Sequence, residues 1–71
     1  MYAVKRQLEL KASLVRADMS YRRLAIAMQE RGHRFHENDV SRIVSGRWFP
    51  PENVRQSIAS ILGKKTFELF H

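Results

Sequence analysis

Cysteine is absent from this 71-residue chain, so neither disulfides nor thiolate zinc sites can stabilise it. A chain without cysteine also agrees with a reducing compartment. No apolar run approaches the roughly 20 residues that a transmembrane helix needs. The segment "MYAVKRQLELK" has no uninterrupted apolar core of the kind found in signal peptides. We therefore expect a cytoplasmic protein with no membrane partner.

Glycine and proline are also scarce, since the chain has three glycines and two prolines. No stretch shows a sustained alternation of polar and apolar residues. Such a chain favours helices over strands. We predict one all-α domain over residues 1–71, a compact bundle of four to five short helices with a central helix-turn-helix. A domain of this size buries only about 60% of the surface of its unfolded chain, so close helix packing, oligomerisation or a metal must support it.

Acidic residues are outnumbered by basic ones. The chain has 13 Lys and Arg against 7 Asp and Glu, a net charge of +6 and a pI of about 10.6. This balance favours a polyanionic partner, nucleic acid above all. Simple solubility would also explain it, so the charge needs support from motifs.

The first helix is predicted from about Tyr2 to Ala17, with residues 1–9 as an N-terminal extension. One face carries Val4, Leu8, Lys11, Ala12 and Val15, and a second apolar edge carries Leu10, Leu14 and Ala17. Residues from Leu10 onward should join the core, whereas the extension could offer apolar surface to a partner chain. Asp18 is predicted to end the helix in the left-handed conformation.

The helix-turn-helix is predicted over residues 20–46, and its first helix begins at a strong capping signal. Ser20 is a good N-cap, and Met19 and Leu24 have the spacing of a hydrophobic staple. The helix can continue to about Arg31. Gly32 should stop it, because glycine readily adopts the left-handed conformation.

The second helix of this pair is predicted to begin within residues 36–38 and to continue to Ser45. Phe35 and Val40 have staple spacing, and Asp39 occupies the position of a capping-box acid. Favourable placement of negative charge at a helix N-terminus is the interpretation we favour for Asp39. The glycine after Ser45 should end the helix.

Closing helices are predicted over residues 51–70. The adjacent prolines Pro50 and Pro51 should start a helix. Its apolar residues follow helical spacing: Val54, Ile58, Ile61 and Leu62. Gly63 should end it, and a short final turn should place Phe67 and Phe70 over the bottom of the core.

Several segments in this order are typical of one family. "VSRIVSGR", Val40–Arg47, resembles the recognition-helix signature of Xre/Cro-type (lambda-repressor-like) helix-turn-helix proteins, and "SYRRLA" is similar to the helix before it. "VRQSIASILGKKTFELF" resembles the family's closing pattern. "LKASLVRADMSYRRLA" and "GRWFPP" are similar to Ner-like phage regulators. The resemblance covers about Leu10 to Phe70, nearly the whole chain.

The resemblance implies a sequence-specific regulator of transcription that binds double-stranded DNA. Such a protein would be a small repressor of bacterial or phage origin, acting on the nucleoid as a homodimer at least on DNA. The chain departs from the family pattern at four points. The turn "QERGHRF" is longer than usual, Asp18 replaces a common glycine, Tyr21 replaces a Gln that touches the DNA backbone, and Glu37 replaces a Gln, Arg or Ser.

In a helix-turn-helix the second helix enters the major groove, and its N-terminal residues meet base edges. The candidate base-contacting residues are therefore His36, Glu37, Asn38, Ser41 and Arg42. Asn38 could pair with adenine, Arg42 with guanine, and Glu37 could accept from cytosine N4. The alternatives are favourable placement of the Glu37 charge at the helix N-terminus and pairing of Arg42 with Glu30 or Asp39.

Residues that flank this helix are candidates for contacts with the DNA backbone: Ser20, Tyr21, Arg22, Arg34, Arg47 and Trp48. The start of a helix has free amides and a positive dipole end, which suit a phosphate. Trp48 could instead be a core residue or meet a second subunit, and Phe49 is expected to cover the core. Solvated charge is the expected role of Arg16, Arg55, Lys64 and Lys65.

Metal binding and catalysis have little support. His33 and His36 have a spacing that can place two imidazoles together, with Glu37 nearby and Asp39 or His71 as a third ligand. There is no HExxH pattern to support such a site. We expect no metal, no cofactor and no enzyme activity, because no catalytic constellation stands out and so small a domain leaves little room for a pocket.

Two other binding functions compete with DNA recognition. A protein-interaction module could retain the helix-turn-helix scaffold without binding DNA, and the apolar segment "YAVKRQLEL" favours it. RNA binding has weaker support, because the chain lacks a GXXG loop and a sheet with stacking aromatics.

Overall fold

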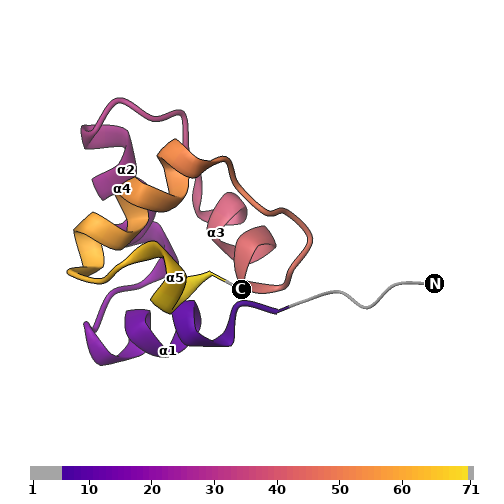
Figure 1. Cartoon of the computed structure of the whole chain (residues 1–71). Helices are drawn as coiled ribbons and strands as arrows, with labels where there is room; N and C mark the ends of the chain where they lie inside the picture. Colours follow the sequence, from indigo (N-terminus) through magenta and orange to yellow (C-terminus); the bar gives the residue numbers. More distant parts are fainter. Residues whose placement is uncertain (1–5, 71) are drawn as a thin grey trace.

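Five helices follow one another in the computed structural model, which describes residues 6–70 (Figure 1). They are α1 (Leu8–Arg16), α2 (Tyr21–Glu30), α3 (Glu37–Val44), α4 (Glu52–Leu62) and α5 (Thr66–Leu69). No strand occurs in this range, and the radius of gyration is 11.2 Å. The predicted all-α bundle is confirmed. None of the helices within residues 6–70 is both long and apolar enough to cross a membrane.

The start of α1 lies later in the chain than predicted. Residues 1–5, which include Tyr2, are outside the described part. Gln7 is buried and not helical, and its backbone N–H donates to the carbonyl oxygen of Val44 (2.9 Å). This bond holds the chain against the end of α3, so the helix begins only at Leu8. The predicted extension over residues 1–9 is therefore wrong for residues 6 and 7.

The two predicted apolar edges of α1 have different environments. Leu10 and Leu14 are buried in the core, whereas Leu8 and Val15 are 63% and 71% exposed. A helix of this length can pack only one stripe against a bundle, and the bundle takes the edge with two large leucines. The other edge remains on the surface.

The connection from α1 to α2 forms as predicted. Asp18 has a positive φ of 53°. Ser20 is the N-cap of α2, and its Oγ accepts from the backbone N–H of Arg23 (3.1 Å). Met19 packs against the core that contains Leu24, as expected for a staple.

Replacement of Ser20 by alanine should lower the free energy of unfolding by about 1 kcal/mol, because one N–H of the first turn loses its acceptor. For a domain of this size that corresponds to a Tm lower by about 4–8 °C. Circular dichroism during thermal unfolding would measure it. Ser60→Ala, at an exposed position inside α4, is the matched control and should leave the Tm unchanged or slightly higher. Equal Tm values for the two variants would contradict the capping role.

The turn between α2 and α3, residues 31–36, is long but well held. The Gln29 side-chain amide donates to the carbonyl oxygen of Phe35 (2.7 Å), and Phe35 itself is buried. The His33 ring nitrogen Nε2 and the hydroxyl of Ser57 on α4 are 2.8 Å apart. The turn is thus fixed to α2, to the core and to α4, which fixes the direction in which α3 leaves it.

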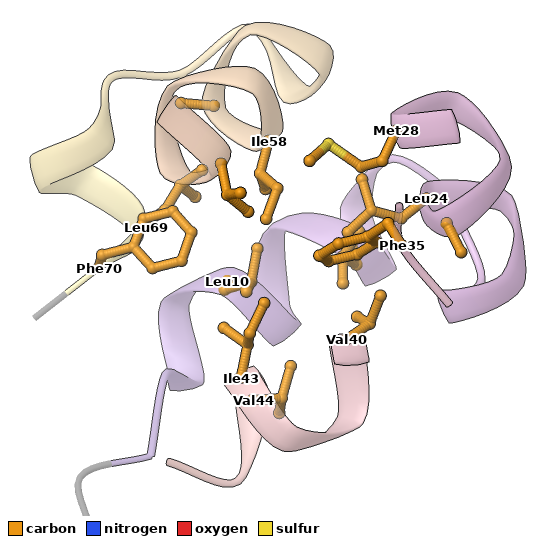
Figure 2. Close-up of a cluster of buried hydrophobic side chains, with 14 residues drawn as sticks. Leu10, Leu24, Met28, Phe35, Val40, Ile43, Val44, Ile58, Leu69 and Phe70 are labelled. Carbon is orange, nitrogen blue, oxygen red and sulfur yellow. The ribbon is translucent and has the colours of Figure 1, made fainter. Parts of the chain in front are cut away.

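The predicted N-terminal cap and the predicted C-terminal glycine stop of α3 both form. The carboxylate of Asp39 accepts from the backbone N–H of His36 (2.9 Å) at the start of the helix. At the end, Gly46 has a φ of 84°, and the backbone N–H of Arg47 donates to the carbonyl oxygen of Arg42 (2.8 Å). Figure 2 shows the inner face of α3 directed into the core, where Val40 is fully buried.

The closing helices differ from the prediction at one residue. Gly63 ends α4 with a φ of 67°, and Leu69 and Phe70 are buried. Phe67 was predicted to cover the core, but it is 67% exposed. Because α5 is a single turn, the residue two positions before Leu69 lies on the opposite side of the helix.

The segment that precedes α4 also corrects a prediction. Pro50 is buried, whereas Phe49, expected to cover the core, is 55% exposed. Its ring meets that of Phe70 edge-on at 6.3 Å, and the guanidinium of Arg55 lies 4.7 Å from its centroid. Arg55 also donates to the carbonyl oxygen of Pro50 (2.6 Å). Arg55 is therefore a structural residue and not simply a solvated charge.

Candidate nucleic-acid interface

α3 separates its apolar and polar residues onto two faces. Val40, Ile43 and Val44 are buried against the other helices. The exposed residues of the opposite face are Glu37, Asn38, Ser41 and Arg42, and His36 at the N-cap is exposed as well. All five predicted base-contacting residues thus lie in or next to α3 and are open to solvent. Their side chains supply both hydrogen-bond donors and acceptors.

Arg42 is held by two neighbours. Its Nη1 donates to Asp39 Oδ1 (3.1 Å), and its guanidinium lies 5.4 Å from the centroid of the Trp48 ring. Asp39, and not Glu30, is therefore its partner. Since the same carboxylate also caps α3, Asp39 joins the first turn of the helix to this arginine.

Trp48 belongs mainly to the edge of the core. It is half-buried, and its ring packs against Phe35 with centroids 6.4 Å apart. Trp48 was predicted to contact a DNA backbone. The structure assigns the ring a packing role, in which it supports both Phe35 and Arg42.

A first depression lies between α2 and the start of α3. Its volume is about 420 Å³, and the polar side chains in its lining are Arg22, Gln29, His36, Glu37 and Asn38. It brings the predicted backbone residue Arg22 next to three predicted base-contacting residues. The two helices of the helix-turn-helix therefore share one surface, in which these polar side chains surround Ala25 and the exposed Ile26.

A second depression borders the other end of this surface. It has a volume of about 240 Å³, and Arg6, Lys11, Tyr21, Ser41 and Ser45 are the polar residues that line it. Tyr21 and Ser41 were predicted site residues, but Arg6 and Lys11 were missed. The sequence contains no sign of them beyond their charge, because their position depends on the bond between residues 7 and 44.

The remaining predicted residues lie around α3 and α2. Arg34 is exposed in the turn before α3, and Arg47 is exposed directly after Gly46, so the two arginines bracket the helix. Ser20 is exposed, and its hydroxyl already accepts the bond that caps α2. These placements bring basic groups to both ends of α3.

Few of the basic side chains around this surface form ion pairs with carboxylates of the described chain. Within residues 6–70 the ion pairs are Arg16–Glu9 (3.6 Å) and Arg42–Asp39 (3.1 Å). Arg22, Arg34 and Arg47 are therefore not neutralised by a carboxylate of the described chain. Arginines in this state attract phosphate groups, and the attraction is screened by salt.

The histidines do not gather into a cluster. His33 is engaged by Ser57. His36 is the N-cap residue of α3, where its backbone N–H donates to Asp39, and His71 lies outside the described residues. Within residues 6–70 no group of three or more His, Cys, Asp or Glu side chains could hold a metal ion.

Comparisons with protein-family models, with curated proteins and with solved structures found no match to this chain. The resemblance to Xre/Cro-type proteins is therefore an expectation from motifs. We infer a function from the arrangement of the side chains on this surface.

Proposed function

We propose that this chain is a sequence-specific regulator that binds double-stranded DNA and inserts α3 into the major groove. The observation that supports this most strongly is the exposed polar face of α3, bracketed by arginines that no carboxylate within residues 6–70 neutralises. The major groove, about 12 Å wide, admits a helix of this kind. The N-terminal half of the helix would meet base edges.

Three side chains of α3 would contact base edges, each with a different hydrogen-bonding pattern: Asn38, Arg42 and Glu37. The Asn38 amide carries a donor and an acceptor, which match adenine N6 and N7. Arg42 suits guanine O6 and N7, and Glu37 suits the amino group of cytosine. Arg42 would have to leave Asp39, but exposed ion pairs contribute only about 0–1 kcal/mol, so a guanine can compete.

The backbone of the duplex would be held from both sides of α3. The residues for these contacts are Arg22 and Tyr21 at the start of α2, Arg34 in the turn and Arg47 after α3. Such contacts position the protein without reading sequence. A homodimer would place two copies of α3 in successive major grooves about 34 Å apart, and occupation of a promoter would then repress transcription.

Selection of bound DNA from a random pool, followed by fluorescence anisotropy across a salt series, tests this proposal. The selected sequence should be palindromic. It should bind at least about 10³-fold more tightly than an unrelated duplex. The logarithm of the binding constant should fall linearly with the logarithm of salt concentration, with a slope of about −0.9 per phosphate contact. No selected sequence and no salt dependence would overturn the proposal.

The competing proposal, a protein-interaction module, rests on the exposed apolar edge of α1. Leu8 and Val15 lie on this edge and are largely exposed. For such a module we expect an oligomer that persists at high salt and an activity unaffected by Arg22→Glu and Arg47→Glu. Loss of DNA binding in the charge-reversed variants would favour the DNA-binding proposal instead.

A further inference from the structure

The second depression lies where three helices meet: the start of α1, the start of α2 and the second half of α3. Arg6 and Lys11 come from the α1 side, Tyr21 from α2, and Ser41 and Ser45 from α3 and its C-cap. These segments are distant in the sequence, and Figure 1 shows the beginning of α1 close to α3. The depression is therefore a product of the fold.

A backbone bond builds the α1 side of this depression. The N–H of Gln7 donates to the carbonyl oxygen of Val44 (2.9 Å), and the carbonyl oxygen of Gln7 accepts from the N–H of Lys11 (3.2 Å). Gln7 is buried, so it anchors the chain. Arg6 precedes the anchor and Lys11 follows it by one helical turn, which brings both exposed cations to the same depression.

The charges in the depression are all of one sign. No Asp or Glu contributes to its lining, and Glu9, the acidic residue of α1, pairs with Arg16 instead (3.6 Å). Two cations that converge without a carboxylate repel each other, so an anion bound between them would relieve the repulsion. The hydroxyls of Tyr21 and Ser41 add donors for its oxygens, whereas Ser45 already donates to the carbonyl oxygen of Arg42 (3.2 Å).

We propose that this depression binds one phosphate diester of the DNA backbone, held by Arg6 and Lys11 with donors from Tyr21 and Ser41. The inference rests on the proposed function and names a contact beyond it. Ser41 lies both in this depression and on the exposed face of α3, so a duplex that meets α3 brings a phosphate to the same place. Ser41 thereby contacts backbone, not a base edge, and the start of α1 sets how deeply α3 enters the groove.

The test compares Arg6→Gln/Lys11→Gln with Lys64→Gln/Lys65→Gln, which removes the same charge from exposed residues between α4 and α5. Together Arg6 and Lys11 should contribute about one unit of the salt slope, because they neutralise one phosphate. If the loss is counterion release, the double substitution weakens binding about eightfold at 0.1 M salt. Selected and unrelated DNA should be affected equally. The control should keep the wild-type slope.

Two further variants separate donors from charge. Tyr21→Phe should weaken binding with an unchanged salt slope, because it removes a hydroxyl and no charge. Ser41→Ala should weaken binding to all sequences without changing the base preferences found by selection. A relaxed preference at one base position would show that Ser41 reads a base and would overturn its assignment to this phosphate.

The outcomes distinguish this inference from the function on which it rests. If the wild-type chain binds no DNA, both are overturned. If it binds, and the Arg6/Lys11 double variant behaves like the Lys64/Lys65 double variant, only the phosphate site is overturned. Thermal unfolding of each variant confirms that the fold is retained, which we expect because the substituted cations are all exposed.

Discussion

Replacement of Phe35 by alanine should unfold a large fraction of the molecules at 25 °C. Phe35 is 1% exposed, packs against Trp48 and pairs with Val40 in the staple that starts α3. Removal of a buried phenylalanine side chain costs about 3–5 kcal/mol. Domains have total stabilities of only about 5–15 kcal/mol, and a small domain lies at the lower end. Urea unfolding followed by circular dichroism would measure the loss.

Phe67→Ala is the matched control, because it deletes the same side chain from a position that is 67% exposed. Its unfolding free energy should stay within about 0.5 kcal/mol of the wild-type value. Similar losses in the two variants would mean that Phe35 does not anchor the turn. A large loss for Phe67 would restore the core role that the sequence predicted for it.

Substitution of Asn38 by aspartate should weaken binding to the selected DNA by at least about tenfold. A bidentate amide–base pair contributes about 1–3 kcal/mol of discrimination, and the new carboxylate lacks the donor. It would also lie next to Glu37 and face an anionic groove. Anisotropy with selected and unrelated duplexes would separate the loss of sequence reading from general repulsion.

The control for this substitution is Asn53→Asp. Asn38 and Asn53 are both exposed, and both occupy the second position of a helix, α3 and α4 respectively. A carboxylate near a helix N-terminus is favourable, so neither variant should lose stability. The two variants carry the same net charge. Equal DNA affinity for both would contradict a role of Asn38 in reading a base.

The capping and stop signals of the helices were predictable because they are local. Ser20, Asp39 and Gly46 satisfy backbone groups within a few residues of themselves, so a short window of sequence identifies them. The outward face of α3 followed from the same local periodicity. These features define most of the fold and the centre of the candidate site.

The features that could not be predicted depend on contacts between distant segments. The start of α1 is decided by a bond from Gln7 to Val44, and that bond also brings Arg6 and Lys11 to the surface beside α3. The exposure of Phe49 follows from Pro50 occupying the core in its place. No pattern in a short window of sequence contains these pairings.

Asp39 limits how the α3 surface can be redesigned. One carboxylate accepts from the backbone of His36 and from the guanidinium of Arg42, so a change at residue 39 alters both the helix start and the arginine. Glu37 and Asn38 make no side-chain hydrogen bond within residues 6–70. A combinatorial library for new DNA targets should therefore randomise residues 37 and 38 freely and keep Asp39 constant. If residue 39 were varied as well, selection from the library would enrich for clones that retain the fold and not for clones with altered DNA recognition.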